Sequence, residues 1–180
     1  IQDQTSPNLA HIPTTNLITY SEDFSQWVLT NCTIDSNVEV SPNEETNADR
    51  LNFSAVNALC RFITSSGNPD GKTFTNSIYL KADTSTSVKL VILGSGGGLG
   101  YKEETLTLTN EWQRFSITQS FSSAGDNVRL RLSSTEVGSI FAWGGQLEEQ
   151  SQATAYIKSN GIAAVRKATT TNLVPYSEDF

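Results

Sequence analysis

Residues 74–82 read FTNSIYLKA, and their side chains alternate between the two faces of a predicted β-strand. One face carries Phe74, Asn76, Ile78 and Leu80, and the other carries Tyr79 and Lys81. Strict alternation of this kind indicates a strand with one face packed on a core and the other exposed. We therefore expect this stretch to lie inside an antiparallel sheet.

The same pattern extends to both sides of this strand. Residues 128–134 (VRLRLSS) place three apolar side chains inward and Arg129 and Arg131 outward, and residues 87–93 form a nearly continuous apolar run. Further strands are expected at 32–40, 50–55, 59–65, 105–109, 112–121, 139–149 and 153–158, and no stretch has a sustained 3.6-residue period. With about nine or ten short strands, the sequence predicts an all-β antiparallel β-sandwich or jelly roll.

A second feature is an internal repeat. Residues 14–24 read TTNLITYSEDF and residues 170–180 read TTNLVPYSEDF, so nine of eleven positions are identical at an offset of 156 residues. A repeat at a fixed offset predicts a tandem array of one structural unit. The alternative is that the sequence boundary falls by chance inside a second domain.

The repeat predicts four segments. Residues 1–15 are expected to form a linker or an extended arm from a preceding unit, and residues 16–158 the jelly-roll domain, with its first strand expected over 16–24. A second linker is expected at 159–171, and residues 172–180 are expected to be the first strand of the next repeat. That strand would expose the side chains that we expect to mediate assembly, namely Asn172, Leu173, Val174, Tyr176 and Phe180.

Composition excludes several classes of function. Only 37% of the 180 residues are hydrophobic and 17% charged, and the formal net charge is −7. A duplex nucleic-acid binder needs a basic stripe, and the sequence contains none. The sequence also has no run of 18 apolar residues, which a membrane-spanning helix would need. We therefore expect neither nucleic-acid binding nor membrane insertion.

The chain has two cysteines, Cys32 and Cys60, and one histidine, His11. This set does not supply the four clustered nitrogen and sulfur ligands of a structural zinc site. The cysteines are either a disulfide, if the protein matures outside the cytosol, or two buried free thiols.

The sequence contains no recognisable catalytic motif. The acidic residues occur mainly as adjacent pairs such as Glu22–Asp23, Glu103–Glu104 and Glu148–Glu149. Neighbours on a strand point to opposite faces, so these pairs are poor candidates for the two carboxylates of a glycosidase. The glycine-rich stretch 94–100 lacks the Lys-Ser/Thr of a phosphate loop. We therefore predict that the protein is not an enzyme.

Four stretches together carry a resemblance to a known group of domains. They are NLITYSEDFSQW (16–27), FTNSIYLKA (74–82), WQRFSIT (112–118) and FAWGGQLEEQSQATAYI (141–157). They resemble a β-jelly-roll domain that is similar to carbohydrate-binding modules and recurs in bacteriophage tail-fibre and bacterial surface proteins. The resemblance implies two antiparallel sheets whose first and last strands meet. This sequence differs from the usual C-terminal end of such domains, because Tyr156 and Ile157 are followed by Lys158 and Ser159 where Pro-Thr is typical.

The resemblance also implies candidate sites. Such modules stack sugars on exposed aromatic rings and hydrogen-bond their hydroxyls with polar side chains. The candidates for glycan binding are Tyr79, Lys81, Tyr101, Arg129 and Arg131. Related modules often carry a structural calcium, for which Glu22, Asp23 and Glu148 are the candidate ligands. No other cofactor is expected.

Two functions remain open. The first is a non-enzymatic structural repeat of an extracellular or virion-surface fibre, whose partners are neighbouring copies or repeats of itself. The second is an adhesion module that recognises cell-surface carbohydrate. Both place the protein on a virion, outside the cell or at the cell surface.

Overall fold

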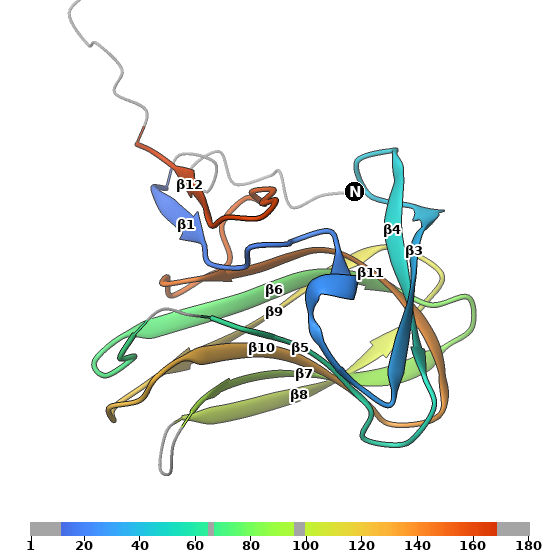
Figure 1. Cartoon of the computed structure of the whole chain (residues 1–180), viewed down its shortest axis with the longest axis horizontal. Helices are drawn as coiled ribbons and strands as arrows, with labels where there is room; N and C mark the ends of the chain where they lie inside the picture. Colours follow the sequence, from blue (N-terminus) through green and yellow to red (C-terminus); the bar gives the residue numbers. More distant parts are fainter. Residues whose placement is uncertain (1–11, 65–66, 96–99, 169–180) are drawn as a thin grey trace, which may run out of the picture.

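Two five-stranded antiparallel sheets face each other in a computed structural model that describes residues 12–64, 67–95 and 100–168 (Figure 1). Sheet I has the strand order β2-β5-β10-β7-β8, and sheet II has the order β3-β4-β11-β6-β9. A two-stranded ribbon, β1-β12, lies outside the sandwich. This arrangement confirms the predicted all-β sandwich.

The bounds of the strands are as follows. Sheet I contains β2 (Val28–Thr30), β5 (Leu59–Ile63), β7 (Thr86–Gly94), β8 (Tyr101–Leu108) and β10 (Val128–Ser134). Sheet II contains β3 (Cys32–Val40), β4 (Thr46–Phe53), β6 (Thr73–Lys81), β9 (Gln113–Ser120) and β11 (Gly138–Glu148). The ribbon contains β1 (Thr14–Asn16) and β12 (Ala164–Arg166).

The core lies between the two sheets and is built by the alternation read from the sequence. In β6, Phe74, Ile78 and Leu80 point inward and are buried. Asn76 lies among them, and its Nδ2 donates to the carbonyls of Val91 at 3.2 Å and Arg129 at 3.3 Å in sheet I. A polar side chain therefore links the two sheets inside an otherwise apolar core.

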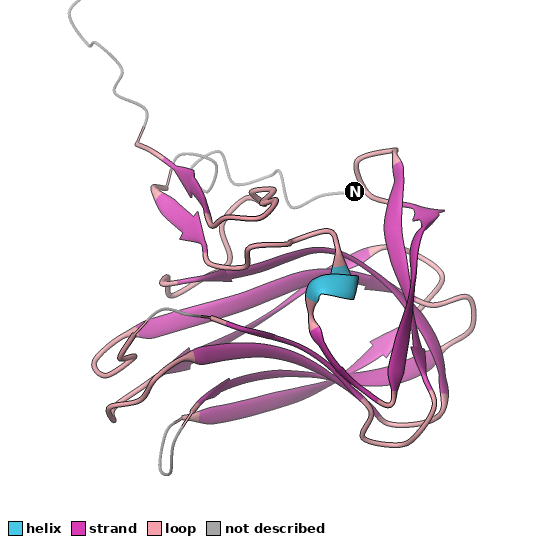
Figure 2. Ribbon diagram, viewed as in Figure 1, coloured by secondary structure: helices cyan, strands magenta, loops and turns pink. Residues whose placement is uncertain are grey.

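The strand count differs slightly from the prediction. The described residues contain twelve strands and one short 3-10 helix, η2 (Phe24–Gln26), which is the cyan turn in Figure 2. The additional strands are the three-residue β1, β2 and β12, which are too short to show alternation. The predicted strand at 153–158 is wrong, because this stretch takes an irregular path over sheet II. The predicted strand at 16–24 is also irregular after Asn16.

The predicted linker at 159–171 needs correction over its described part. Ser159 is buried, and its Oγ donates to the Ile18 carbonyl at 2.5 Å. Beyond it, β12 pairs antiparallel with β1, with Thr14 opposite Arg166. Ser159 thus packs on the domain and residues 164–166 pair with β1, whereas residues 160–163 between them are exposed. β1 itself begins inside the predicted arm 1–15.

Candidate functional site

The outer faces of the two sheets differ in how far they are covered. On sheet II, the ring of Tyr156 packs 4.7 Å from that of Trp143 between centroids, and Trp143 is buried. The β1-β12 ribbon lies beyond β11, on the side of the sandwich away from β8 (Figure 1). The outer face of sheet I is therefore the more open of the two.

Tyr101 is the most prominent aromatic residue on that open face. It begins β8, and 51% of its surface is exposed. Arg131, on the central strand β10, places its guanidinium carbon 5.9 Å from the centre of the Tyr101 ring and its Nη2 at 3.5 Å from the hydroxyl. The two side chains form an aromatic and cationic surface across three strands.

Two further charged residues complete this surface. The Glu103 carboxylate accepts hydrogen bonds from the Tyr101 hydroxyl and, at 2.9 Å, from Lys89 Nζ. These bonds hold the pKa of Glu103 below its usual value, and the bond that the Tyr101 hydroxyl donates to Glu103 raises the pKa of Tyr101. At neutral pH the face therefore presents a neutral phenol, an ionised carboxylate and two cations.

In the part of the chain that the structure describes, the arginines of sheet I form no ion pair with an acidic side chain. All ion pairs found within residues 12–64, 67–95 and 100–168 are made by lysines. Arg129 donates from Nε to the Asn127 amide oxygen at 3.0 Å, whereas the Nε atoms of Arg61 and Arg131 are buried with no partner in the described part of the chain. Because these Nε atoms are buried or already bonded, the donors that remain for a planar or polyhydroxylated ligand are the terminal Nη atoms.

The five predicted glycan-binding residues do not form one site. Tyr101, Arg129 and Arg131 lie on the outer face of sheet I, whereas Tyr79 and Lys81 belong to β6 in sheet II. Tyr79 packs at 5.4 Å from Trp143 between ring centroids, and Lys81 forms a 2.9 Å ion pair with Glu39. The structure therefore places the two sets on opposite sides of the sandwich.

Sequence reasoning missed three residues of the sheet I surface, namely Arg61, Lys89 and Glu103. The signal was present for Lys89, which alternates with the buried Val88 and Leu90 in β7. Glu103 lies two positions after Tyr101 and so shares its face.

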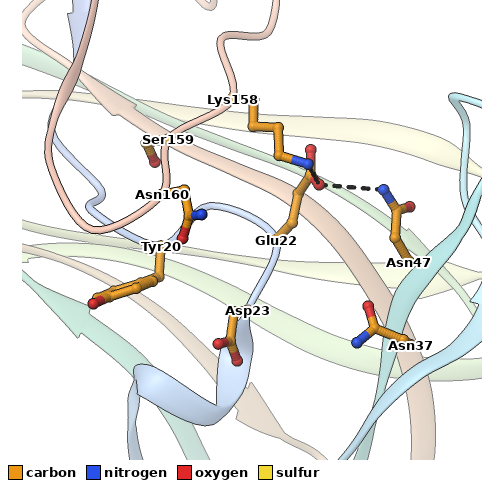
Figure 3. A pocket seen from close by; sticks show the side chains of 8 residues that line it. All are labelled: Tyr20, Glu22, Asp23, Asn37, Asn47, Lys158, Ser159 and Asn160. Atoms are coloured by element: carbon orange, nitrogen blue, oxygen red, sulfur yellow. Dashed lines mark hydrogen bonds and ion pairs between the residues drawn. The ribbon is translucent and has the colours of Figure 1, made fainter.

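A polar pocket of about 180 Å³ lies where the two ends of the domain meet. Figure 3 shows its lining, which consists of Tyr20, Glu22, Asp23, Asn37, Asn47, Lys158, Ser159 and Asn160. Glu22 already accepts from the Tyr156 hydroxyl at 3.0 Å and from Asn47 Nδ2 at 3.2 Å, and it lies 2.7 Å from Lys158 Nζ. Burial raises the pKa of Tyr156, which keeps its hydroxyl protonated as a donor. The carboxylate of Glu22 is thus used for internal contacts.

The predicted calcium ligands are held apart by other contacts. Glu148 is fully buried and accepts from Thr14 Oγ1 at 3.0 Å, Thr154 Oγ1 at 2.7 Å and the Thr154 backbone N–H at 2.8 Å. Asp23 instead caps η2 by accepting from the Ser25 N–H at 3.1 Å. In the described ranges, no three acidic, histidine or cysteine residues gather in a way that could hold a metal ion.

Both cysteines are buried free thiols in this structure. Burial raises the pKa of Cys32 to about 11, and burial together with the neighbouring Cys32 raises that of Cys60. The sequence left open a disulfide or two free thiols, and the structure has the free thiols.

Two remaining expectations concern segments outside the sandwich. The predicted assembly strand, with Asn172, Leu173, Val174, Tyr176 and Phe180, lies outside the described residues. Among the residues that are described, no helix is long and apolar enough to cross a membrane.

Comparison of the sequence alone finds no matching protein family and no matching curated protein. The fold, in contrast, matches solved structures. One is the xylan-binding CBM22-1 domain of Paenibacillus barcinonensis Xyn10C, with a TM-score of 0.54 and 11% identity over 77% of this chain and 97% of that one. A CBM4 structure gives a TM-score of 0.53 and 17% identity over 76% of this chain and 94% of that one.

A third similar structure is the enzymatically active domain of tailspike protein 4 of bacteriophage CBA120. Its TM-score is 0.53 at 16% identity, and the match covers 73% of this chain but only 21% of the tailspike chain. Identities this low establish the fold alone. The chain has the jelly-roll fold that is found in carbohydrate-binding modules and in part of a phage tailspike.

Proposed function

We propose that this chain is a non-catalytic carbohydrate-binding module and that the sugar binds to the outer face of sheet I. The observation that carries the proposal is the half-exposed Tyr101 ring with Arg131 and Glu103 beside it, on the more open of the two sheet faces. The fold shared with carbohydrate-binding modules supports it.

The chemistry of this face suits a sugar. The apolar C–H face of a pyranose ring packs on an aromatic ring, and Tyr101 offers one that needs little rearrangement. Sugar hydroxyls both donate and accept hydrogen bonds, so they match a surface that combines guanidinium donors with a carboxylate acceptor. Arg61, Arg129 and Arg131 supply the donors and Glu103 the acceptor.

The proposed role is binding without turnover. Glu103 is held ionised by Tyr101 and Lys89, so it is poorly suited to donate a proton to a glycosidic oxygen. We place the module outside the cell or on a particle surface, where polymeric carbohydrate is accessible.

A second candidate function is a structural repeat in a virion or cell-surface fibre. The repeated stretch TTNL-x-x-YSEDF at 14–24 and 170–180 favours it, because adjoining copies of one domain would each begin with this stretch. Repetition would also raise the avidity of a weak sugar site, so the two functions are compatible.

A glycan array followed by calorimetry with the best ligand tests the binding proposal. Tyr101→Ala and Arg131→Ala should each weaken binding about tenfold or more, since each removes a principal contact. Lys102→Ala is the matched control, because Lys102 is an exposed cation on the same strand with the opposite orientation and should bind as the wild type does. Equal affinity in all four proteins would contradict the proposed face, and an array without any ligand would contradict the function.

A further inference from the structure

The outer face of sheet I gathers positive charge on an acidic protein. Alternation along its strands turns five charged side chains to this face, namely Arg61, Lys89, Glu103, Arg129 and Arg131. Four are cations and one is an anion, so these side chains carry a net charge of +3, whereas the whole chain carries −7. The charge of this face is thus opposite in sign to that of the protein.

Two of these arginines lie directly opposite each other. Arg131 of β10 pairs in register with Arg61 of β5, so the two side chains leave the sheet on the same face. Like charges in directly opposite positions of an antiparallel pair are destabilising. No ion pair that the structure describes within residues 12–64, 67–95 and 100–168 offsets this repulsion. The pair is therefore unfavourable for folding, and such local conflicts are expected at functional sites.

The packing of these two arginines leaves their terminal nitrogens as the groups that can meet a ligand. Val91 of β7 lies opposite Arg131 on the outer face and is nevertheless fully buried. The Nε atoms of Arg61 and Arg131 are buried as well. Both observations indicate that the aliphatic stems lie flat on the sheet. The terminal nitrogens of a guanidinium group form a planar fork that matches a carboxylate or a sulfate group with two parallel hydrogen bonds.

The single carboxylate of this face is already paired elsewhere. Glu103 lies in β8 opposite Val91, on the far side of β7 from the two arginines. It accepts a hydrogen bond from the Tyr101 hydroxyl and forms a 2.9 Å ion pair with Lys89. The excess positive charge at Arg61 and Arg131 is therefore available to an anion that a ligand supplies.

The width of the face sets the size of that ligand. Neighbouring strands are about 4.8 Å apart, so Arg61 in β5 lies roughly 14 Å from Tyr101 in β8, three strands away. One sugar ring packed on Tyr101 does not reach Arg61. An oligosaccharide that runs across the strands contacts both and passes over Arg131 between them.

We propose that the ligand of this face is an acidic polysaccharide, with an anionic group bound between Arg61 and Arg131 and another of its sugar rings packed on Tyr101. This inference rests on the proposed carbohydrate-binding function and narrows its ligand to polymers that contain uronic acids, sialic acids or sulfated sugars. The bound anion places negative charge between two like charges, so it relieves a repulsion that is present in the unliganded protein. The gain in binding comes from charge-assisted hydrogen bonds to both guanidinium groups.

A glycan array with uronate-bearing, sialylated, sulfated and neutral oligosaccharides of equal length is the first test. Acidic oligosaccharides should bind at least about tenfold more tightly than neutral ones. Their binding should weaken when NaCl is raised from about 0.05 M to about 0.5 M, because salt screens exposed charges. The uronate, sialate and sulfate arms identify the source of the anion.

The array separates failure of this inference from failure of the proposed function. Neutral glycans that bind as tightly as acidic ones would overturn the acidic ligand and leave carbohydrate binding in place. An array without any ligand would contradict both. A single-stranded oligonucleotide that binds as tightly as the best glycan would also overturn the proposal, because the face would then select charge and not sugar.

Arg61→Gln tests the position of the anion. In calorimetry with the best acidic ligand, this variant should bind about tenfold or more weakly than the wild type. The neutral form of the same ligand, carboxyl-reduced or desulfated, should bind both proteins equally. Arg114→Gln is the matched control, because it removes an arginine from β9 in sheet II and should bind as the wild type does. Equal affinity of Arg61→Gln and the wild type for the acidic ligand would place the anion elsewhere and refute this site.

Thermal unfolding without ligand gives an independent readout. Arg61→Gln removes one of two like charges, so the Tm should stay the same or rise. The acidic ligand should then raise the Tm of the wild type more than that of Arg61→Gln. A Tm that falls by about 5 °C or more in unliganded Arg61→Gln would show that the arginine pair serves the fold, and it would contradict the assignment of the pair to a ligand.

Discussion

The hydroxyl of Tyr156 lies 2.6 Å from the hydroxyl of Ser21 and 3.0 Å from the Glu22 carboxylate. This contact joins two positions 135 residues apart in sequence and fastens the end of the domain to its beginning. The Tyr156 ring also packs on Trp143, so the same side chain covers the outer face of sheet II.

Tyr156→Phe should keep this packing and lose both hydrogen bonds. Because the Ser21 and Glu22 groups would lose a partner in a largely buried place, we expect the free energy of unfolding to fall by about 1–2 kcal/mol. Urea unfolding measures the change. Tyr20→Phe is the control, since the Tyr20 hydroxyl points away from the other pocket side chains in Figure 3. Equal losses in the two variants would contradict a specific role for Tyr156.

Arg166→Ala should loosen the β1-β12 ribbon. The guanidinium donates to the carbonyls of Ile12 and Ala155, both at 3.0 Å, and to Thr154 Oγ1 at 2.6 Å. We expect a loss of about 2 kcal/mol and faster amide exchange in residues 12–16. Arg166→Lys should recover little, because an ammonium cannot reproduce three divergent donors. Full recovery with lysine would show that the charge alone matters.

Stability should fall at alkaline pH because of Cys32. Burial raises the pKa of this thiol from 9.0 to about 11, so between these values the unfolded chain releases a proton that the folded chain keeps. The free energy of unfolding therefore decreases as the pH rises, by about 1–2 kcal/mol over the interval. Unfolding of Cys32→Ala under reducing conditions should show a shallower decline above pH 9 and no altered slope between pH 6 and 8. Identical alkaline slopes would argue against Cys32 as the source.

The native protein should resist alkylation. Both thiols are buried and Cys60 is fully enclosed, so the reactive thiolate is scarce at neutral pH. Iodoacetamide should modify both cysteines only after denaturation. An intact mass two hydrogens lighter without reductant would instead reveal a Cys32–Cys60 disulfide.

The alternation of side chains predicted the core well, because in β6 and β10 the inward residues alternate with polar residues that face outward. It could not predict on which sheet a strand lies. Tyr79 and Tyr101 both point outward, but β6 and β8 belong to different sheets, so the two rings lie on opposite sides. Sheet membership depends on long-range pairing, and this pairing leaves no local trace in the sequence.

The segment 153–158 shows a second limit. Its sequence, ATAYIK, alternates like a strand, but tertiary contacts determine its path. Thr154 bonds to Glu148, Tyr156 bonds to Ser21, and the Ile157 N–H donates to the Gln146 side chain at 2.8 Å. Side-chain acceptors thus replace the partner strand that alternation would require.

The pairing of β1 with β12 has a mechanical consequence. In an antiparallel pair the chain enters and leaves at the same end of the ribbon, where Thr14 faces Arg166. A force that pulls the flanking chain apart would load the ribbon's hydrogen bonds one after another, as in a zipper, instead of all at once. The ribbon should therefore yield at low force and lengthen the tether while the sandwich stays folded. Such a domain would limit the peak force on any structure that pulls on both of its ends, because the ribbon extends before the sandwich unfolds.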